Sequence, residues 1–174
     1  MGETDLMGGM RVPKDDLRIA ALGEVDELNA AIGLAMAVIE DRDITAALHR
    51  VQNDLFTVGA DLSVAPGKEL KLPKVTEGHV KALERDIEKL SPGAASEFVL
   101  PGGSMQVACL QLARAIARRA ERAAVALSRH QELSKHVLEY LNRVSTLLYV
   151  LALNVKKSTG LTEEHPKYDR PEMK

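Results

Sequence analysis

Three arginines spaced by four residues are the clearest chemical feature of this 174-residue sequence. Arg114, Arg118 and Arg122 would line one side of a helix, because residues four apart lie one above the next. We call this row the arginine face; Glu121 lies beside it. Guanidinium groups make paired hydrogen bonds to oxyanions, and three in a row repel one another unless something negative lies against them. A triphosphate or a set of carboxylates would meet that need, but a solvated basic face or a subunit interface held by ion pairs would also explain the pattern.

Two carboxylates interrupt an apolar stretch nearer the start of the chain. Asp26 and Glu27 stand between Val25 and Leu28, and burying an unpaired charge is costly. Each carboxylate therefore needs either a partner or a place on the solvent side, and an arginine of the arginine-rich helix is the partner we expect. Asn142 is similarly a polar residue among apolar ones.

The histidines and glycines argue against three common kinds of site. A di-iron bundle needs Glu-x-x-His pairs on facing helices, and zinc proteases use His-x-x-x-His. Neither spacing occurs, and we interpret each histidine as a surface residue: His49, His79, His130, His136 and His165. The Gly-x-x-x-x-Gly-Lys-Ser/Thr loop is absent too, so nucleotide binding of the Walker type is not supported.

Five helices would position these side chains. Apolar residues recur at helical spacing in five stretches, which predict helices over about residues 17–40, 43–62, 76–90, 104–129 and 133–157. Residues 65–74 form a longer loop, residues 1–13 show no clear periodicity, and no strand alternation persists. The predicted class is all-α, a five-helix bundle. On the fourth helix we expect the packing face to consist of Leu112, Ala115, Ile116, Ala120 and Ala124.

The composition limits the class of protein. Apolar residues make up 45% and charged residues 28%, as in a soluble globule, and the length suits one domain over residues 1–174. A formal net charge of -2 gives no general attraction to nucleic acid or an acidic membrane. Cys109 is the single cysteine, and neither a signal peptide nor a membrane-spanning run is evident. We expect a cytoplasmic protein.

Six segments of the sequence resemble the PduO-type ATP:cob(I)alamin adenosyltransferases. The segments occur in the family order from the start of the chain to about Asn154. One of them alone would be weak, but the ordered set is highly specific. They are Arg11–Asp16, Val25–Asn29, Gln52–Phe56, Phe98–Ser104, Arg118–Arg122 and Tyr140–Arg143.

The resemblance implies a five-helix bundle that assembles as a homotrimer, with active sites between neighbouring subunits. The implied reaction transfers the 5′-deoxyadenosyl group of ATP to the cobalt of cob(I)alamin and releases triphosphate. Mg²⁺ would accompany ATP, with no protein side chain as a metal ligand. The cobalt attacks carbon directly, so no general base is required. A reductase and an adenosylcobalamin-dependent client enzyme would fit as partners, whereas nucleic acid and membranes would not.

The resemblance also assigns residues by position. Arg114 would pair with Asp26 of the next subunit, and these two form the catalytic set with Arg118. Phe98 would lie beneath the corrin and keep the lower axial ligand off cobalt. Residues 1–14 would be a nucleotide-binding segment. Independently of the resemblance, Pro166 and Pro171 predict a loosely ordered tail over residues 161–174. The implied ATP-binding residues are Gly2, Thr4, Asp5, Lys14, Arg118, Arg119, Glu121, Arg122 and Asn142.

The sequence departs from the family pattern at two places. It opens at Met1 without the Thr-Arg-Thr-Gly-Asp portion of the family's nucleotide motif. Either residues precede Met1 in the native chain, or an upstream start codon was missed, or this form lacks the segment. We favour one of the first two, because Met1 falls where the motif tolerates any residue. Thr146 stands where the family commonly has Asp.

Two other functions stay open beside the adenosyltransferase. A relative of the family could hold and deliver adenosylcobalamin without making it, and nucleotide turnover separates that protein from the enzyme. A helical interaction protein could use the arginine face only for assembly, and it would bind neither cobalamin nor ATP.

Overall fold

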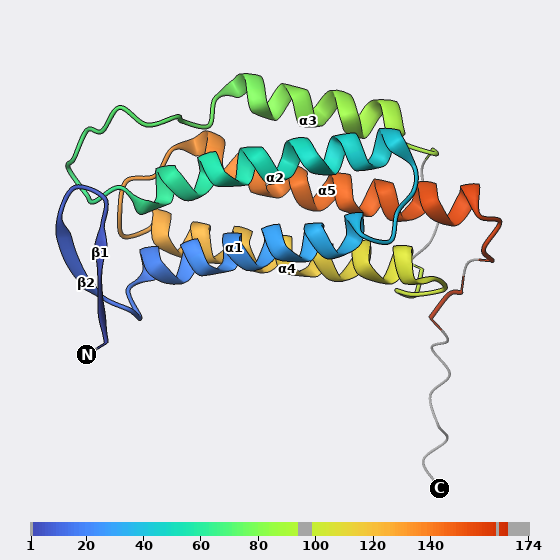
Figure 1. Cartoon of the computed structure of the whole chain (residues 1–174), viewed down its shortest axis with the longest axis horizontal. Helices are drawn as coiled ribbons and strands as arrows, with labels where there is room; N and C mark the ends of the chain where they lie inside the picture. The colour runs from blue at the N-terminus through green and yellow to red at the C-terminus, as the bar shows by residue number, and fades with distance from the viewer. Residues whose placement is uncertain (1, 94–98, 163, 167–174) are drawn as a thin grey trace, which may run out of the picture.

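The computed structural model of the chain describes residues 2–93, 99–162 and 164–166. Its five helices run antiparallel to their neighbours in the chain (Figure 1): α1 Leu17–Met36, α2 Arg42–Ser63, α3 Glu77–Leu90, α4 Met105–Ser128 and α5 Lys135–Ser158. α4 packs against α1 and α5, while α2 packs against α1 and α3 against α5. The predicted five-helix bundle is confirmed. Within the described residues, no helix is long and apolar enough to span a membrane.

A β-hairpin occupies the start of the chain, where the sequence predicted no regular structure. β1 Glu3–Leu6 pairs antiparallel with β2 Met10–Pro13. Gly8 and Gly9 in the turn both have positive φ, at 102° and 81°, a conformation that glycine adopts without steric cost. Strands of four residues are too short to reveal a period of two. The expectation for residues 1–13 is therefore corrected to one small hairpin, added to the predicted helical bundle.

The hairpin is docked at the end of the bundle where α1 begins and α2 ends (Figure 1). The amide of Met7 donates to the Ser63 carbonyl at 2.9 Å, and the amide of Ala65 donates to the Met7 carbonyl at 2.9 Å. Leu6 and Val12 are buried with Ala65 in a small apolar cluster. These contacts hold the N-terminal residues in a defined position relative to the helices.

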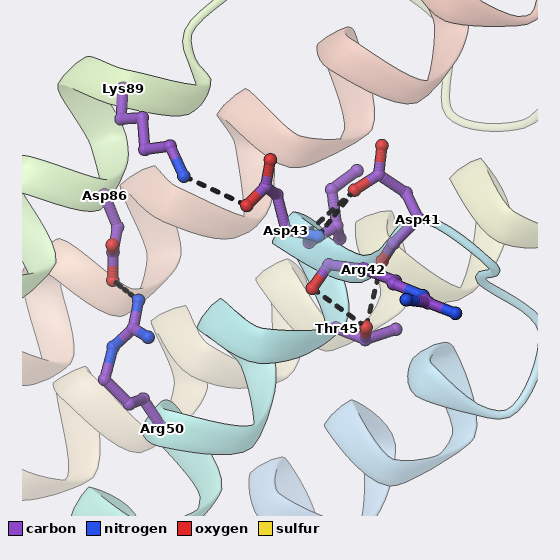
Figure 2. A network of polar contacts seen from close by, with 8 residues as sticks. Asp41, Arg42, Asp43, Thr45, Arg50, Asp86 and Lys89 are labelled. Atoms are coloured by element: carbon purple, nitrogen blue, oxygen red, sulfur yellow. Dashed lines mark hydrogen bonds and ion pairs between the residues drawn. The ribbon is translucent and has the colours of Figure 1, made fainter.

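Polar contacts at the start of α2 order its first turn and join it to α3 (Figure 2). Asp41 caps the helix, and its carboxylate accepts a hydrogen bond from the Asp43 amide at 2.9 Å. Lys89 of α3 reaches the Asp43 carboxylate at 3.0 Å, and Arg50 pairs with Asp86 at 2.5 Å. Exposed pairs of this kind contribute little each. They supplement the packing of α3 against α5.

One side of α4 differs from the packing face that the sequence predicted. Ile116, Ala120 and Ala124 are buried as expected. Leu112, however, is 51% exposed, and Ala115 is exposed as well. The buried side of α4 includes Ala113, Ala117, Ala120 and Ala124, and the 3.6-residue period places Ala115 away from that side. Leu112 and Ala115 therefore form an apolar strip on the outside of α4.

Candidate active site

The members of the arginine face differ in their surroundings. Arg118 and Arg122 are exposed, and neither guanidinium has a polar partner among the described residues. Arg114 is half-buried, and its Nε donates to Gln111 Oε1 at 2.6 Å. A guanidinium group without a carboxylate partner keeps its full set of donors for an anion.

A cavity of about 300 Å³ opens beside Arg114 and Arg118, and we call it the arginine cavity. α4 and α5 supply most of its wall, and the segment before α4 supplies the rest. It is lined by Val99, Pro101, Gln111, Arg114, Arg118, Ser145, Thr146 and Tyr149. Two positive side chains thus border a space whose other lining residues are neutral. Such a space is suited to a negatively charged group.

Sequence reasoning missed most of the α5 wall of this cavity. Ser145, Thr146 and Tyr149 follow Asn142 at helical spacing, so a polar stripe on one side of the last helix was a usable signal. Thr146, where the sequence departs from the family pattern, lies in the cavity wall itself. Phe98 lies outside the described residues.

Arg119 faces α1 rather than the arginine cavity. Its guanidinium pairs with Glu24 at 2.5 Å and also with Glu27. The hydrogen bonds to Glu24, and then those to Glu27, raise the pKa of Arg119. An arginine of α4 is therefore the partner of Glu27, as predicted, and Glu24 is a second partner that the sequence did not single out. The assignment of Arg119 to ATP stays a prediction.

Asp26 is exposed and takes no part in that ion pair. It lines a separate groove of about 410 Å³ between α1 and α2, together with Phe56, whose side chain is 75% exposed. Among the described residues, nothing joins Asp26 to Arg114. Their pairing between subunits stays a prediction.

Glu121 and Asn142 are brought together from α4 and α5. Asn142 Nδ2 donates to Glu121 Oε1 at 2.8 Å. Glu121 follows Arg118 by three residues and so lies beside it on the helix. The structure thus gathers three of the predicted ATP-binding residues around one side of α4.

The hairpin carries the other predicted ATP-binding residues. The Lys14 amide donates to the Gly2 carbonyl at 2.8 Å and closes the open end of the hairpin. Thr4 lies in β1, and the Asp5 carboxylate is 3.7 Å from the Arg11 guanidinium. The Lys14 side chain is exposed, without a polar partner in the described part of the chain. The candidate residues therefore fall into two groups, and no hydrogen bond or ion pair between described residues links the hairpin to the arginine face.

A further polar region lies next to the hairpin, and none of the predicted site residues lines it. Arg18 is 4% exposed and donates to Gln131 at 2.9 Å and to the Leu62 carbonyl at 3.0 Å. Asp61 Oδ2 is buried without a hydrogen-bond partner among the described atoms. Burial raises the pKa of Asp61, and the charge of Lys74 opposes that shift. Arg18 and Asp61 both line a cavity of about 760 Å³.

Metal-binding side chains are not clustered in the part of the chain that the structure describes. No three residues of the types His, Cys, Asp and Glu lie there in an arrangement that could hold a metal ion.

Comparisons with known proteins bear on the family of this chain. A family model described as cobalamin adenosyltransferase matches residues 1–155. The chain is 42% identical to the corrinoid adenosyltransferase of Bacillus subtilis over 166 aligned residues. The alignment covers 92% of this chain and 84% of that protein. The cobalamin adenosyltransferase of Cupriavidus metallidurans is 41% identical over 165 residues, which is 91% of this chain and 85% of that protein.

A solved structure shows the same fold. It is a variant PduO-type ATP:corrinoid adenosyltransferase from Lactobacillus reuteri, complexed with cobalamin and ATP. Its TM-score to this chain is 0.85 at 31% sequence identity, and the match covers 95% of this chain and 94% of that chain.

Proposed function

The chain belongs to the cobalamin adenosyltransferase family, and from this membership we propose that it transfers the 5′-deoxyadenosyl group of ATP to the cobalt of cob(I)alamin. The products are adenosylcobalamin and triphosphate. One observation in the structure carries the proposal furthest: Arg118, without a carboxylate partner among the described residues, borders a cavity whose lining is neutral apart from Arg114. This arrangement suits a reaction whose leaving group is a polyanion.

The chemistry explains the residue types. The electron pair of cobalt(I) forms the bond to the 5′ carbon, and the bond from that carbon to oxygen breaks, so triphosphate leaves with the bonding electrons. No proton is removed. Arg118, Arg122 and Lys14 stabilise the charge that develops on the triphosphate. Alignment of the cobalt, the 5′ carbon and the leaving oxygen provides much of the remaining rate enhancement, because effective molarities in well-oriented systems reach about 10⁵ M or more.

We propose further that ATP enters as its Mg²⁺ complex, with the triphosphate as the main ligand of the ion. Residues 1–14 act as the nucleotide-binding segment, and the protein works in the cytoplasm. The exposed Lys14 side chain supports the role of residues 1–14 in nucleotide binding.

The site is completed by a second copy of the chain, in a homotrimer. Three features support this proposal. Lys14 and Arg118 have no contact within one chain, and Asp26 and Arg114 each lack an oppositely charged partner among the described residues. The outside of α4 also exposes the apolar strip of Leu112 and Ala115, which a neighbouring subunit would cover.

An anaerobic assay tests the function. Chemically reduced cob(I)alamin, MgATP and the protein are mixed, and visible absorbance and triphosphate release are followed. We expect conversion to adenosylcobalamin with one triphosphate released per turnover. The same assay is run with Thr-Arg-Thr-Gly-Asp added ahead of Met1. Tight binding of both substrates without conversion in either form would support a delivery protein instead.

Phe98→Ala tests the exclusion of the lower axial ligand. A large apolar ring there would keep both water and ligand away from cobalt and so ease reduction of cobalt(II). We expect the variant to be slowed most when cobalamin is supplied as cobalt(II) with a reductant, and less when it is supplied as cobalt(I). Equal losses in the two assays would refute this role.

A further inference from the structure

Lys156 is a buried lysine of α5 with a single polar contact. Its exposed fraction is 4%, and Nζ donates to the main-chain carbonyl of Leu100 at 3.2 Å. Nζ has no other polar partner in the described part of the chain. A lysine at a buried position loses hydration, and an apolar residue of similar size would avoid that loss. The hydrogen bond to the Leu100 carbonyl is therefore what a lysine provides here and an apolar residue does not.

The main chain of Leu100 is held from two sides. Its carbonyl accepts from Lys156, and its amide donates to the carbonyl of Glu164 at 2.7 Å. The Leu100 side chain is 40% exposed, so burial of this side chain does little to fix the segment. Hydrogen bonds to α5 and to the residues after it therefore hold the segment in place.

This segment forms one wall of the arginine cavity. Val99 and Pro101, on either side of Leu100, both line the cavity. Tyr149, which also lines it, precedes Lys156 by seven residues and so lies on the same side of α5. Arg114 and Arg118 suit the triphosphate, whereas valine, proline and an aromatic ring suit the less polar of the two substrates, the corrinoid.

We propose that Lys156 is a positioning residue for corrinoid binding: it holds the main chain at Leu100 so that Val99 and Pro101 form the apolar wall of the cavity. This inference rests on the proposed function. Lys156 touches neither substrate and acts through the segment that it anchors.

The test compares the wild-type protein with Lys156→Met, which keeps the length of the side chain and removes the donor. Hydrogen exchange of the Leu100 amide in the ligand-free protein should accelerate about fivefold or more, the equivalent of one lost hydrogen bond. The Kd for cob(II)alamin should rise by a similar factor, while the Kd for MgATP stays unchanged. The unfolding temperature should not fall, because Met fills the same space without a buried charge.

Lys157→Met is the matched control. Lys157 is the next residue on α5, is exposed, and donates to the Pro92 carbonyl at 3.1 Å. We expect it to leave both the Leu100 exchange rate and corrinoid binding unchanged. An unchanged exchange rate of the Leu100 amide in Lys156→Met would overturn the proposal. Faster exchange with a normal Kd for cob(II)alamin would also overturn it, and so would an equal rise in the Kd values for cob(II)alamin and MgATP. Because these are binding measurements, a wild-type protein without turnover would count against the proposed function alone.

Discussion

Adjacent arginines on α4 have different environments in this chain. Arg118 borders the arginine cavity with no polar partner among the described residues, whereas Arg119 is held by Glu24 and Glu27 of α1. Successive residues of a helix point about 100° apart, so neighbours in sequence face different parts of the molecule. A run of like charges therefore does not define one site.

Arg118→Ala should lower turnover by about 10² to 10³, the usual loss when one donor to a developing charge is removed. The fold should be unaffected, since Arg118 is exposed. The measurement is the steady-state rate with cob(I)alamin and MgATP, together with the circular dichroism spectrum. Arg85→Ala, an exposed arginine on α3, is the control and should retain wild-type activity. Near-normal turnover in Arg118→Ala would remove it from the catalytic set.

Asp61→Asn should make stability less dependent on pH. Burial raises the pKa of Asp61 above its usual value of 3.8. A carboxyl group with a raised folded-state pKa favours the folded state below its unfolded pKa, and this contribution is lost as the pH rises through the folded pKa. Thermal unfolding from about pH 3 to about pH 8 should show equal stability at the acid end and an advantage for the variant at the neutral end. An advantage for the wild type at neutral pH would show that Lys74 and Arg18 outweigh burial.

At the scale of elements, the contact between α1 and α4 orients the arginine face. Arg119 of α4 is paired with carboxylates one turn apart on α1, Glu24 and Glu27. These contacts lie within the packing of α4 against α1, and that packing sets the direction in which Arg118 points. If the ion pair contributes to this packing, its loss should affect the arginine cavity, although Arg119 does not line it.

A double-mutant cycle tests this role of Arg119. Arg119→Gln should reduce turnover less than Arg118→Ala does, and adding Glu27→Gln should cause no further loss, because the partner is already gone. Turnover and unfolding temperature are measured for the two single variants and the double variant. Lys89→Gln, which breaks the exposed pair with Asp43, is the control and should keep full turnover. Additive losses in the cycle would indicate that Arg119 acts independently of α1, as a direct ATP ligand would.

At the scale of the whole molecule, the hairpin and the arginine face are separate parts of one chain. Docking on the ends of α1 and α2 places the hairpin, whereas α1 and α5 hold the arginine face of α4. If the hairpin residues and the arginine face form one active site only between subunits, each site contains the hairpin of one chain and the arginine face of another.

Mixing two inactive variants tests this arrangement. Lys14→Ala damages the hairpin half and Arg118→Ala the arginine half. Co-expressed in equal amounts, they should form mixed assemblies in which about one quarter of the interfaces combine two intact halves, and turnover should recover to about that fraction of the wild type. Mixing each variant with itself is the control. No recovery in assemblies shown by mass to be mixed would place both halves of the site in one chain.

Much of the fold was predictable from the sequence because helical periodicity is a local property. Caps such as Ser104 and stops such as Gly160 placed most helix ends within two residues. The hairpin escaped because its strands are too short to show alternation and because the contacts that stabilise it, from Met7 to Ser63 and Ala65, are made with the distant end of α2.

For the candidate site, the sequence by itself determined which residues are candidates: the spacing of the arginine face and the ordered family segments both follow from residue order alone. Only the tertiary structure decided their surroundings. It directed Arg119 to α1, placed Tyr149 in the wall beside Arg118, and buried Lys156 against Leu100. The physical reason is that a side chain's partners come from packing between helices distant in sequence, and the period of one helix does not specify how its neighbours lie against it.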